Sequence, residues 1–400
     1  MTVWDSIVGQ KPVVDLLRAT VRSGRSGADL TGSDLTGSDV PDSPAIAQSW
    51  LICGPPGSGR SQVARAFAAA LECPRGGCGT CPVCRQIMKD EHPDVTVLAT
   101  NKITISIDQV RSLIADSEQM PVTAPWRIII IEDVDRMLER TTNVLLKEIE
   151  EPAPKTIWLL CAPSSQDVLP TIRSRTRIVN LAVPQTRDIA SFLVSSLEVD
   201  QATAARCARL AQGHIGIARL YARDDQALAD RDEIVVGVLN LHRTSDAVVL
   251  AASMVDNANR QAKAEVDQAV MREQAEFRAL NGLAEGEKIS PALKSAYHAI
   301  GKKDDVRRRT TRLSRDILDR FLTTITSIYR DLTLIHNGAE EVSGLINLEN
   351  RAAITDLSAA ISRQQAIANL ASIDTARRRL MHNGSPQLVL EALLSSLIVY

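Results

Sequence analysis

A glycine-rich segment holds the first residues whose types and spacing could do chemistry. Residues 54–61 read GPPGSGRS, after a short apolar stretch and before a helical pattern. In the pattern Gly-x-x-x-x-Gly-Lys-[Ser/Thr], the glycines let consecutive backbone N–H groups face phosphates at a helix N-terminus. Gly54, Gly57, Gly59 and Ser61 fit this pattern. The segment therefore predicts a phosphate-binding loop, with a chance glycine-rich turn as the alternative.

The lysine position of this pattern is occupied by Arg60. A lysine reaches the β and γ phosphates as a compact point charge, whereas a guanidinium is a larger planar fork that cannot take over that geometry. Arg60 therefore calls hydrolysis into question before it calls binding into question. Binding of ATP or ADP without turnover stays open.

Two acids follow the apolar run 128–131, which predicts a buried central strand of a parallel sheet. Glu132 and Asp133 stand at the carboxyl end of that strand, where open α/β sheets place their ligand sites. ATPases with this type of loop usually carry Asp-Glu here, so the order Glu-Asp displaces both carboxylates by about one methylene. The pair either holds Mg²⁺ or only ends the strand, and the sequence leaves both interpretations open.

Four cysteines, Cys73, Cys78, Cys81 and Cys84, lie within twelve residues, with glycines and a proline between them. Four thiolates in so short a stretch can surround a tetrahedral ion, and such closed sites are typically structural zinc. An iron-sulfur cluster is the main alternative, although no cysteine follows Cys84 at the spacing of ferredoxins, and free thiols are the third. His92 is interpreted as a turn residue before a proline, since four cysteines already complete the site.

The composition bounds the size and class of the protein. Four hundred residues with 44% hydrophobic content suffice for two or three domains, and aromatic residues make up only 3%. The net charge of −2 argues against a protein that coats nucleic acid on its own. The three other cysteines are isolated, as in reducing compartments, and no apolar run approaches the roughly 18 residues of a membrane span. We expect a cytoplasmic protein.

Several motifs in a fixed order resemble the clamp-loader branch of the AAA+ ATPases. They are residues 7–10 (IVGQ), the glycine-rich loop, the four cysteines, residues 92–94 (HPD), residues 145–152 (LLKEIEEP) and residues 174–176 (SRT). The resemblance covers the first 225 residues and returns at residues 383–391.

This resemblance implies an α/β AAA+ domain with an inserted zinc knuckle, followed by an all-α lid domain and an all-α collar domain. The expected bounds are 1–184 for the AAA+ domain, with a disordered insertion at 24–48 and the knuckle at 73–84, 185–229 for the lid and 230–400 for the collar. The insertion is polar and repeats the unit Asp-Leu-Thr-Gly-Ser in tandem, which does not bury enough apolar surface to order itself.

The resemblance also implies a role for Arg175. It matches the family's arginine finger, which completes the ATP site of a neighbouring subunit, and Thr176 replaces the cysteine that usually follows. Gly216 matches the position at which motor subunits carry a second arginine, and Arg219 lies too far along the helix for that role. Arg60, the Glu-Asp pair and Gly216 thus all weaken this chain's own ATP site, whereas the finger is retained.

We therefore expect a largely non-hydrolysing subunit of the DNA polymerase III holoenzyme, associated with the replisome. The resemblance implies a hetero-oligomeric ring with gamma/tau and delta subunits, which loads a sliding clamp on primed DNA. An active gamma/tau-type ATPase motor is the alternative, and a DNA-binding repair ATPase is a third. The basic clusters at 302–315 and 377–379 either contact DNA or an acidic partner, or are solvated helix faces.

Overall fold

The computed structural model describes residues 2–26, 46–99, 104–284 and 287–399. The chain forms two compact units, Met1–Arg223 and Asp224–Tyr400. The predicted bounds of an AAA+, a lid and a collar domain stay predictions, although one helix runs through residue 229. None of the helices in the described ranges is long and apolar enough to cross a membrane.

The predicted insertion at 24–48 needs correction at both ends, and its centre, 27–45, lies outside the described residues. The helix before it continues to Ser26. After it, the side chain of Gln48 donates hydrogen bonds to the carbonyl oxygens of Ala153 and Thr156, at 3.2 and 3.0 Å. Residues 24–26 are therefore helical, and Gln48 is bonded to the fold.

The first unit contains a sheet and the helices around it. Its elements are η1 (Val3–Ser6), α1 (Lys11–Ser26), β1 (Ser49–Cys53), α2 (Arg60–Glu72), α3 (Pro82–Met88), β2 (Val95–Leu98), α4 (Ile107–Ser117), β3 (Arg127–Ile131), η2 (Val134–Arg136), α5 (Glu139–Glu150), β4 (Thr156–Ala162), η3 (Ser165–Asp167), α6 (Pro170–Arg173), β5 (Arg177–Asn180), α7 (Thr186–Leu197), α8 (Gln201–Leu210) and α9 (Ile215–Arg223).

The second unit is all helical in its described residues. Its elements are α10 (Asp225–Leu239), α11 (Thr244–Leu280), α12 (Pro291–Ala299), α13 (Lys303–His336), α14 (Glu340–Ser343), η4 (Leu348–Asn350), α15 (Arg351–Ala360), α16 (Arg363–Met381) and α17 (Pro386–Ser396).

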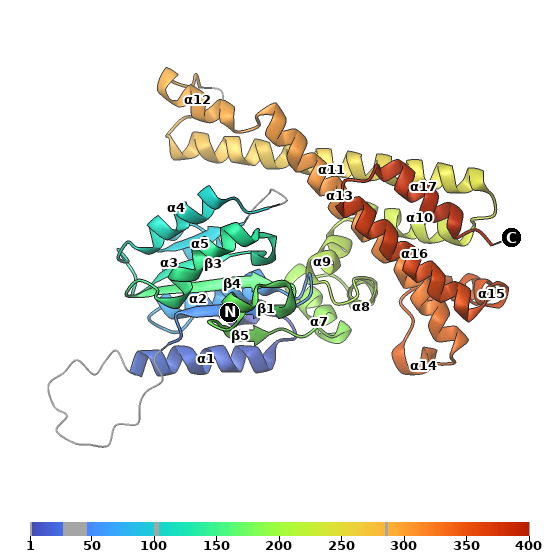
Figure 1. Ribbon diagram of the computed structural model, residues 1–400, viewed down its shortest axis with the longest axis horizontal. Coiled ribbons are helices and arrows are strands. Elements are labelled where there is room, and N and C mark those ends of the chain that lie inside the picture. The colour runs from blue at the N-terminus through green and yellow to red at the C-terminus, as the bar shows by residue number, and fades with distance from the viewer. Residues whose placement is uncertain (1, 27–45, 100–103, 285–286, 400) are drawn as a thin grey trace, which may run out of the picture. The chain divides into compact units, whose positions relative to one another are not determined.

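The five strands form one parallel sheet in the order β2-β3-β4-β1-β5 (Figure 1). This confirms the predicted α/β class and the predicted central strand at 128–131. Because every strand runs in the same direction, the carboxyl ends of β1, β3 and β4 lie at one edge. The glycine-rich loop after β1 and the two acids after β3 therefore share that edge.

Both faces of the sheet are covered, which explains the unbroken apolar runs. Along β3, Ile128 and Ile130 belong to the core that includes α1, α2 and α3. Ile129 and Ile131 belong to a second core with α4, α5 and α6. Side chains alternate between the two faces of a strand, so a strand that is buried on both sides needs an apolar residue at every position.

The motif at 92–94 has a structural role. Asp94 is fully buried and accepts hydrogen bonds from the backbone N–H groups of Val122, Thr123 and Ala124, at 2.7, 2.8 and 3.0 Å. Its carboxylate also lies 3.6 Å from Arg127. Burial raises the pKa of Asp94, but the hydrogen bonds from Val122 and Thr123 outweigh that effect, so the pKa lies below its usual value.

We expect Asp94→Asn to lower the free energy of unfolding by about 3 kcal/mol at pH 7, because an amide cannot accept all these bonds and because Arg127 loses its buried carboxylate partner. A carboxyl group with a lowered folded pKa stabilises the fold above its unfolded pKa and loses that contribution as the pH falls. The difference between wild type and variant should therefore shrink below about pH 4. Urea denaturation over a pH series measures this difference in unfolding free energy. Asp108→Asn, at an exposed carboxylate, is the control. A pH-independent difference would contradict this explanation.

The second unit is organised around two long helices, α11 and α13, which pack side by side, while α12 lies at one end of the pair (Figure 1). Apolar residues of α13 between 317 and 332 recur every three or four positions and are buried in the core of this unit. In the predicted basic cluster, Arg309 pairs with Glu273 and Asp305, at 2.6 and 2.7 Å. Part of that positive charge is thus neutralised within the chain.

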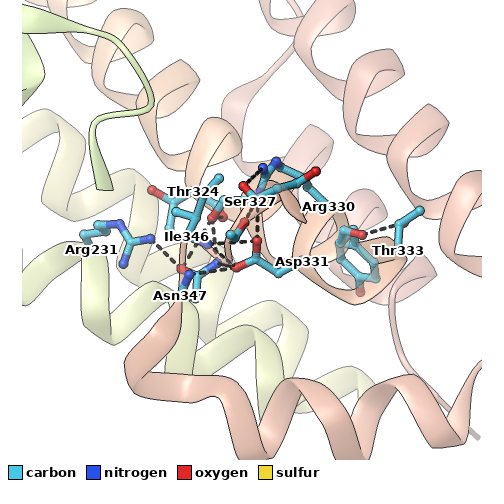
Figure 2. A network of polar contacts seen from close by, with 11 residues as sticks. Arg231, Thr324, Ser327, Arg330, Asp331, Thr333, Ile346 and Asn347 are labelled. Carbon is cyan, nitrogen blue, oxygen red and sulfur yellow. Dashed lines mark hydrogen bonds and ion pairs between the residues drawn. The ribbon is translucent and has the colours of Figure 1, made fainter. Parts of the chain in front are cut away.

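A buried polar network ties this unit together (Figure 2). Asp331 of α13 accepts hydrogen bonds from the backbone N–H groups of Ile346 and Asn347, at 3.0 and 2.7 Å. Arg231 of α10, only 2% exposed, donates to the side-chain oxygen of Asn347. The network fixes the segment before α15 against two helices, and its buried groups are satisfied within the fold.

Candidate functional site

The glycine-rich loop connects the end of β1 at Cys53 to the start of α2 at Arg60. Gly57 and Gly59 have φ angles of +81° and +93°, a region that side-chain-bearing residues rarely adopt. Both glycines thus use their conformational freedom in this loop, and the 13-residue helix α2 begins directly after Gly59.

The start of α9 packs directly on this loop. The backbone N–H of Ile215 donates to the carbonyl oxygen of Gly57 at 3.1 Å. A Cβ atom at Gly57 would lie 2.1 Å from Cγ of His214, and one at Gly59 would lie 3.6 Å from Ile215. His214 and Ile215, which directly precede Gly216, thus lie against the loop.

The guanidinium of Arg60 is hydrogen-bonded to two residues of the same chain, Gly54 and Asp133. Its Nη1 donates to the carbonyl oxygen of Gly54 at 2.6 Å, and its Nη2 donates to Oδ1 of Asp133 at 3.3 Å. Asp133 also lies 3.4 Å from Arg136. The residue in the lysine position and the second acid after β3 are therefore bonded to each other.

The other acid, Glu132, is bonded to a second arginine of α2. Arg65 donates from Nη1 to Glu132 at 2.7 Å and from Nε and Nη2 to Asp90 at 2.7 and 2.8 Å. Burial lowers the pKa of Arg65, but its bonds with Asp90 and Glu132 outweigh that effect and raise it. The arrangement of two acids around one guanidinium leaves Arg65 charged and fixed.

Both acids expected to handle Mg²⁺ are thus engaged by guanidinium groups. Magnesium keeps several waters and binds through one or two carboxylates together with substrate phosphates. Before Glu132 or Asp133 could serve it, each would have to separate from an arginine of α2. This carboxylate pair does not offer the open site of an ATPase in the conformation described.

Arg175 lies at the surface, just after α6, and its side chain is 39% exposed. Nη1 donates to the carbonyl oxygen of Thr171 at 3.0 Å and to Oγ of Ser174 at 3.2 Å. Nε forms an ion pair with Glu150, the last residue of α5. The guanidinium is therefore held by its own chain but remains open to solvent.

The four cysteines converge on one point. Their sulfur atoms all lie within 4.8 Å of one another, and Sγ of Cys73 is 3.7 Å from those of Cys78 and Cys81. A tetrahedral zinc ion with Zn–S bonds of about 2.3 Å separates its sulfurs by about 3.8 Å. The donor set and its spacing fit such an ion. His92, which was interpreted as a turn residue, uses Nδ1 to accept the N–H of Asp94.

The cluster also shows the hydrogen bonds expected around thiolates. Sγ of Cys73 accepts the N–H of Arg75 and Sγ of Cys81 accepts the N–H of Cys84, both at 3.4 Å. Hydrogen bonds from Thr80 lower the pKa of Cys78 to about 5, whereas burial raises that of Cys84. Four cysteines that could bind a metal are thus present in the described part of the chain.

Known proteins match the unit that contains this site. A family model described as "DNA polymerase III, delta subunit" matches residues 41–185. The delta' subunit of DNA polymerase III from Pseudomonas aeruginosa is 35% identical over 135 residues, which are 32% of this chain and 41% of that protein. The one from Haemophilus influenzae is 33% identical over 154 residues, 38% of this chain and 47% of that protein. This part of the chain is similar to DNA polymerase III delta' subunits.

The gamma/tau subunit from Mycobacterium bovis is also similar, with 30% identity over 140 residues, 34% of this chain and 24% of that protein. The chain thus spans less than half the length of these curated relatives. The comparisons confirm the predicted resemblance to DNA polymerase III delta' subunits for residues 41–185, and the roles of individual residues there stay predictions.

Sequence reasoning missed three residues of the first unit: Arg65, Glu150 and His214. In the sequence, nothing distinguishes Arg65 from a solvent-exposed charged residue on a helix. Its contact with Glu132 is formed only in the folded chain. Glu150 lies inside a motif that the sequence had singled out, but nothing there indicated a partner in Arg175. His214 stands two residues before the glycine on which the comparison with motor subunits depended.

Proposed function

We propose that this chain is a clamp-loader subunit of the delta' type, which does not turn over ATP itself and supplies Arg175 to the ATP site of a neighbouring subunit. One observation carries the proposal: both acids after β3 are bonded to arginines of α2, while Arg175 stays exposed. Such a chain does not hydrolyse ATP at its own glycine-rich loop. Its Arg175 can still stabilise charge on the phosphoryl group of ATP bound by a neighbouring subunit.

In this proposal, residues 1–184 act as the AAA+ domain, 185–229 as the lid and 230–400 as the collar. The four cysteines hold a structural zinc ion, which has no open position for catalysis. The partners are gamma/tau and delta subunits in a hetero-oligomeric ring, and the complex acts on a sliding clamp and primed DNA. The similarity to delta' subunits supports these assignments.

Reconstitution tests the proposal. The purified chain alone should hydrolyse ATP no faster than the buffer background, since Glu132 and Asp133 are engaged by Arg65 and Arg60. Added to gamma/tau and delta subunits, it should enter the complex and raise the ATPase rate. Brisk hydrolysis by the isolated chain, abolished by Ser61→Ala, would instead identify a gamma/tau-type motor, to which the chain is 30% identical over 140 residues.

A further inference from the structure

We propose that Glu150 is a positioning residue for Arg175, which holds the guanidinium in the orientation in which it meets a phosphate of the neighbouring subunit. The inference rests on the proposed function of Arg175. The sequence motif at 174–176 identified the arginine finger alone. The inference adds Glu150, which lies on another helix, α5.

The bonding of the guanidinium carries the inference. Nε lies next to the carboxylate of Glu150 in an ion pair, and Nη1 donates hydrogen bonds to the carbonyl oxygen of Thr171 and the hydroxyl of Ser174. Within the described residues Nη2 donates no hydrogen bond. A guanidinium carries five N–H groups in a rigid plane, so the ion pair and the two bonds of Nη1 together also set the direction of the two N–H groups on Nη2.

This arrangement is suited to presenting one edge of the plane to an anion. A free arginine side chain must lose rotamer freedom when it binds, which costs about 0.5–1.5 kcal/mol, whereas a side chain held beforehand has already lost it. The side chains of Arg175 and Glu150 are 39% and 43% exposed, so an incoming phosphate can reach the guanidinium without opening a core.

The ion pair has little to contribute to folding. Exposed ion pairs typically stabilise a protein by about 0–1 kcal/mol, so removing Glu150 should leave the fold intact. An effect of Glu150 on hydrolysis would therefore reflect the orientation of Arg175. Glu151, the next residue, is exposed and forms no ion pair within the described residues, so Glu151→Ala is the matched control.

The experiment measures single-turnover hydrolysis of ATP by the full complex of this chain with gamma/tau and delta subunits. With the complex in excess over ATP, Glu150→Ala should slow the phase that depends on Arg175 by about 3- to 10-fold, because the guanidinium must be ordered at each event. ATP affinity should not change. Glu150→Gln retains an acceptor oxygen and should be intermediate, and Glu151→Ala should match wild type. In an Arg175→Ala background, Glu150→Ala should have no further effect.

A second measurement separates this inference from the proposed function. In the isolated full chain, ¹⁵N relaxation of the Arg175 Nε–H group should report a restricted side chain, and Glu150→Ala should make it mobile. If Arg175 is equally mobile with and without Glu150, the positioning role is wrong, whatever Arg175 does. If Glu150 restrains Arg175 but hydrolysis is indifferent to Arg175→Ala, the proposed function fails and the positioning role fails with it. An additive loss in the double variant would also overturn the inference.

Discussion

Arg175→Ala should slow the hydrolysis of one ATP per assembled complex by about 10³-fold, because an arginine finger stabilises the charge that develops on the transferred phosphoryl group. Arg175 has the exposure that this role needs, and its removal leaves no buried group unpaired. The complex should still assemble and the chain should keep its stability. Single-turnover kinetics with labelled ATP measure the effect, since steady-state rates would average over other sites in the ring.

Arg173→Ala is the matched control for this experiment. Arg173 ends α6, two residues earlier, and bonds to the carbonyl oxygen of Ser165 and the side chain of Gln166, at 3.4 and 3.1 Å. It should leave the rate near that of wild type. Arg175→Lys should recover only part of the lost rate, since an ammonium lacks the planar fork. Equal losses for Arg173→Ala and Arg175→Ala would indicate damage to the local structure.

Removal of the proposed zinc ion from the cysteine cluster should have the second large effect. Structural zinc sites contribute about 10–16 kcal/mol of apparent binding free energy in small domains. This unit has its own core, so we expect a smaller loss, about 5 kcal/mol, or 10–20 °C in Tm. The cluster also holds the N-terminus, because the N–H of Val3 donates to Gly77 at 3.0 Å and Nε1 of Trp4 donates to Gly76 at 3.3 Å. Chelation should therefore expose Trp4.

Metal analysis, thermal denaturation and tryptophan fluorescence measure this prediction together. One zinc ion per chain is expected, and Cys78→Ser should abolish it, whereas Arg75→Ala, an exposed change in the same loop, should not. Returning zinc to the chelated protein should restore Tm. Iron in the purified protein would instead support an iron-sulfur cluster. A metal-free chain with unchanged Tm would show that the thiols are free.

The sequence features that reappear in the structure are those in which the signal is local. The left-handed glycines at 57 and 59, the convergence of the four cysteines and the buried strand at 128–131 each depend on at most about a dozen residues. Strict glycine positions, thiol spacing and full burial leave little freedom in such stretches. The fold therefore places the loop and the acids at the same edge, as expected.

The pairings that decide what the site can do were not predictable, because they join residues far apart in the chain. Arg65 and Glu132 are 67 residues apart, and Arg60 and Asp133 are 73 apart. Nothing in the sequence near Glu132 names its partner, since an arginine on a helix is usually a solvated side chain. The same limit applies to the contact of His214 with the loop and to that of Glu150 with Arg175.

The most direct measurement compares Ser61→Ala with Arg175→Ala in the same reconstituted complex, by single-turnover hydrolysis of ATP. In the proposed function, this chain's own nucleotide pocket does no chemistry and Arg175 acts on the pocket of a neighbouring subunit. The complex with Ser61→Ala should therefore hydrolyse ATP at the wild-type rate, while the complex with Arg175→Ala should lose about 10³-fold at one site. The reverse pattern, with Ser61→Ala impaired and Arg175→Ala unaffected, would contradict the proposed function.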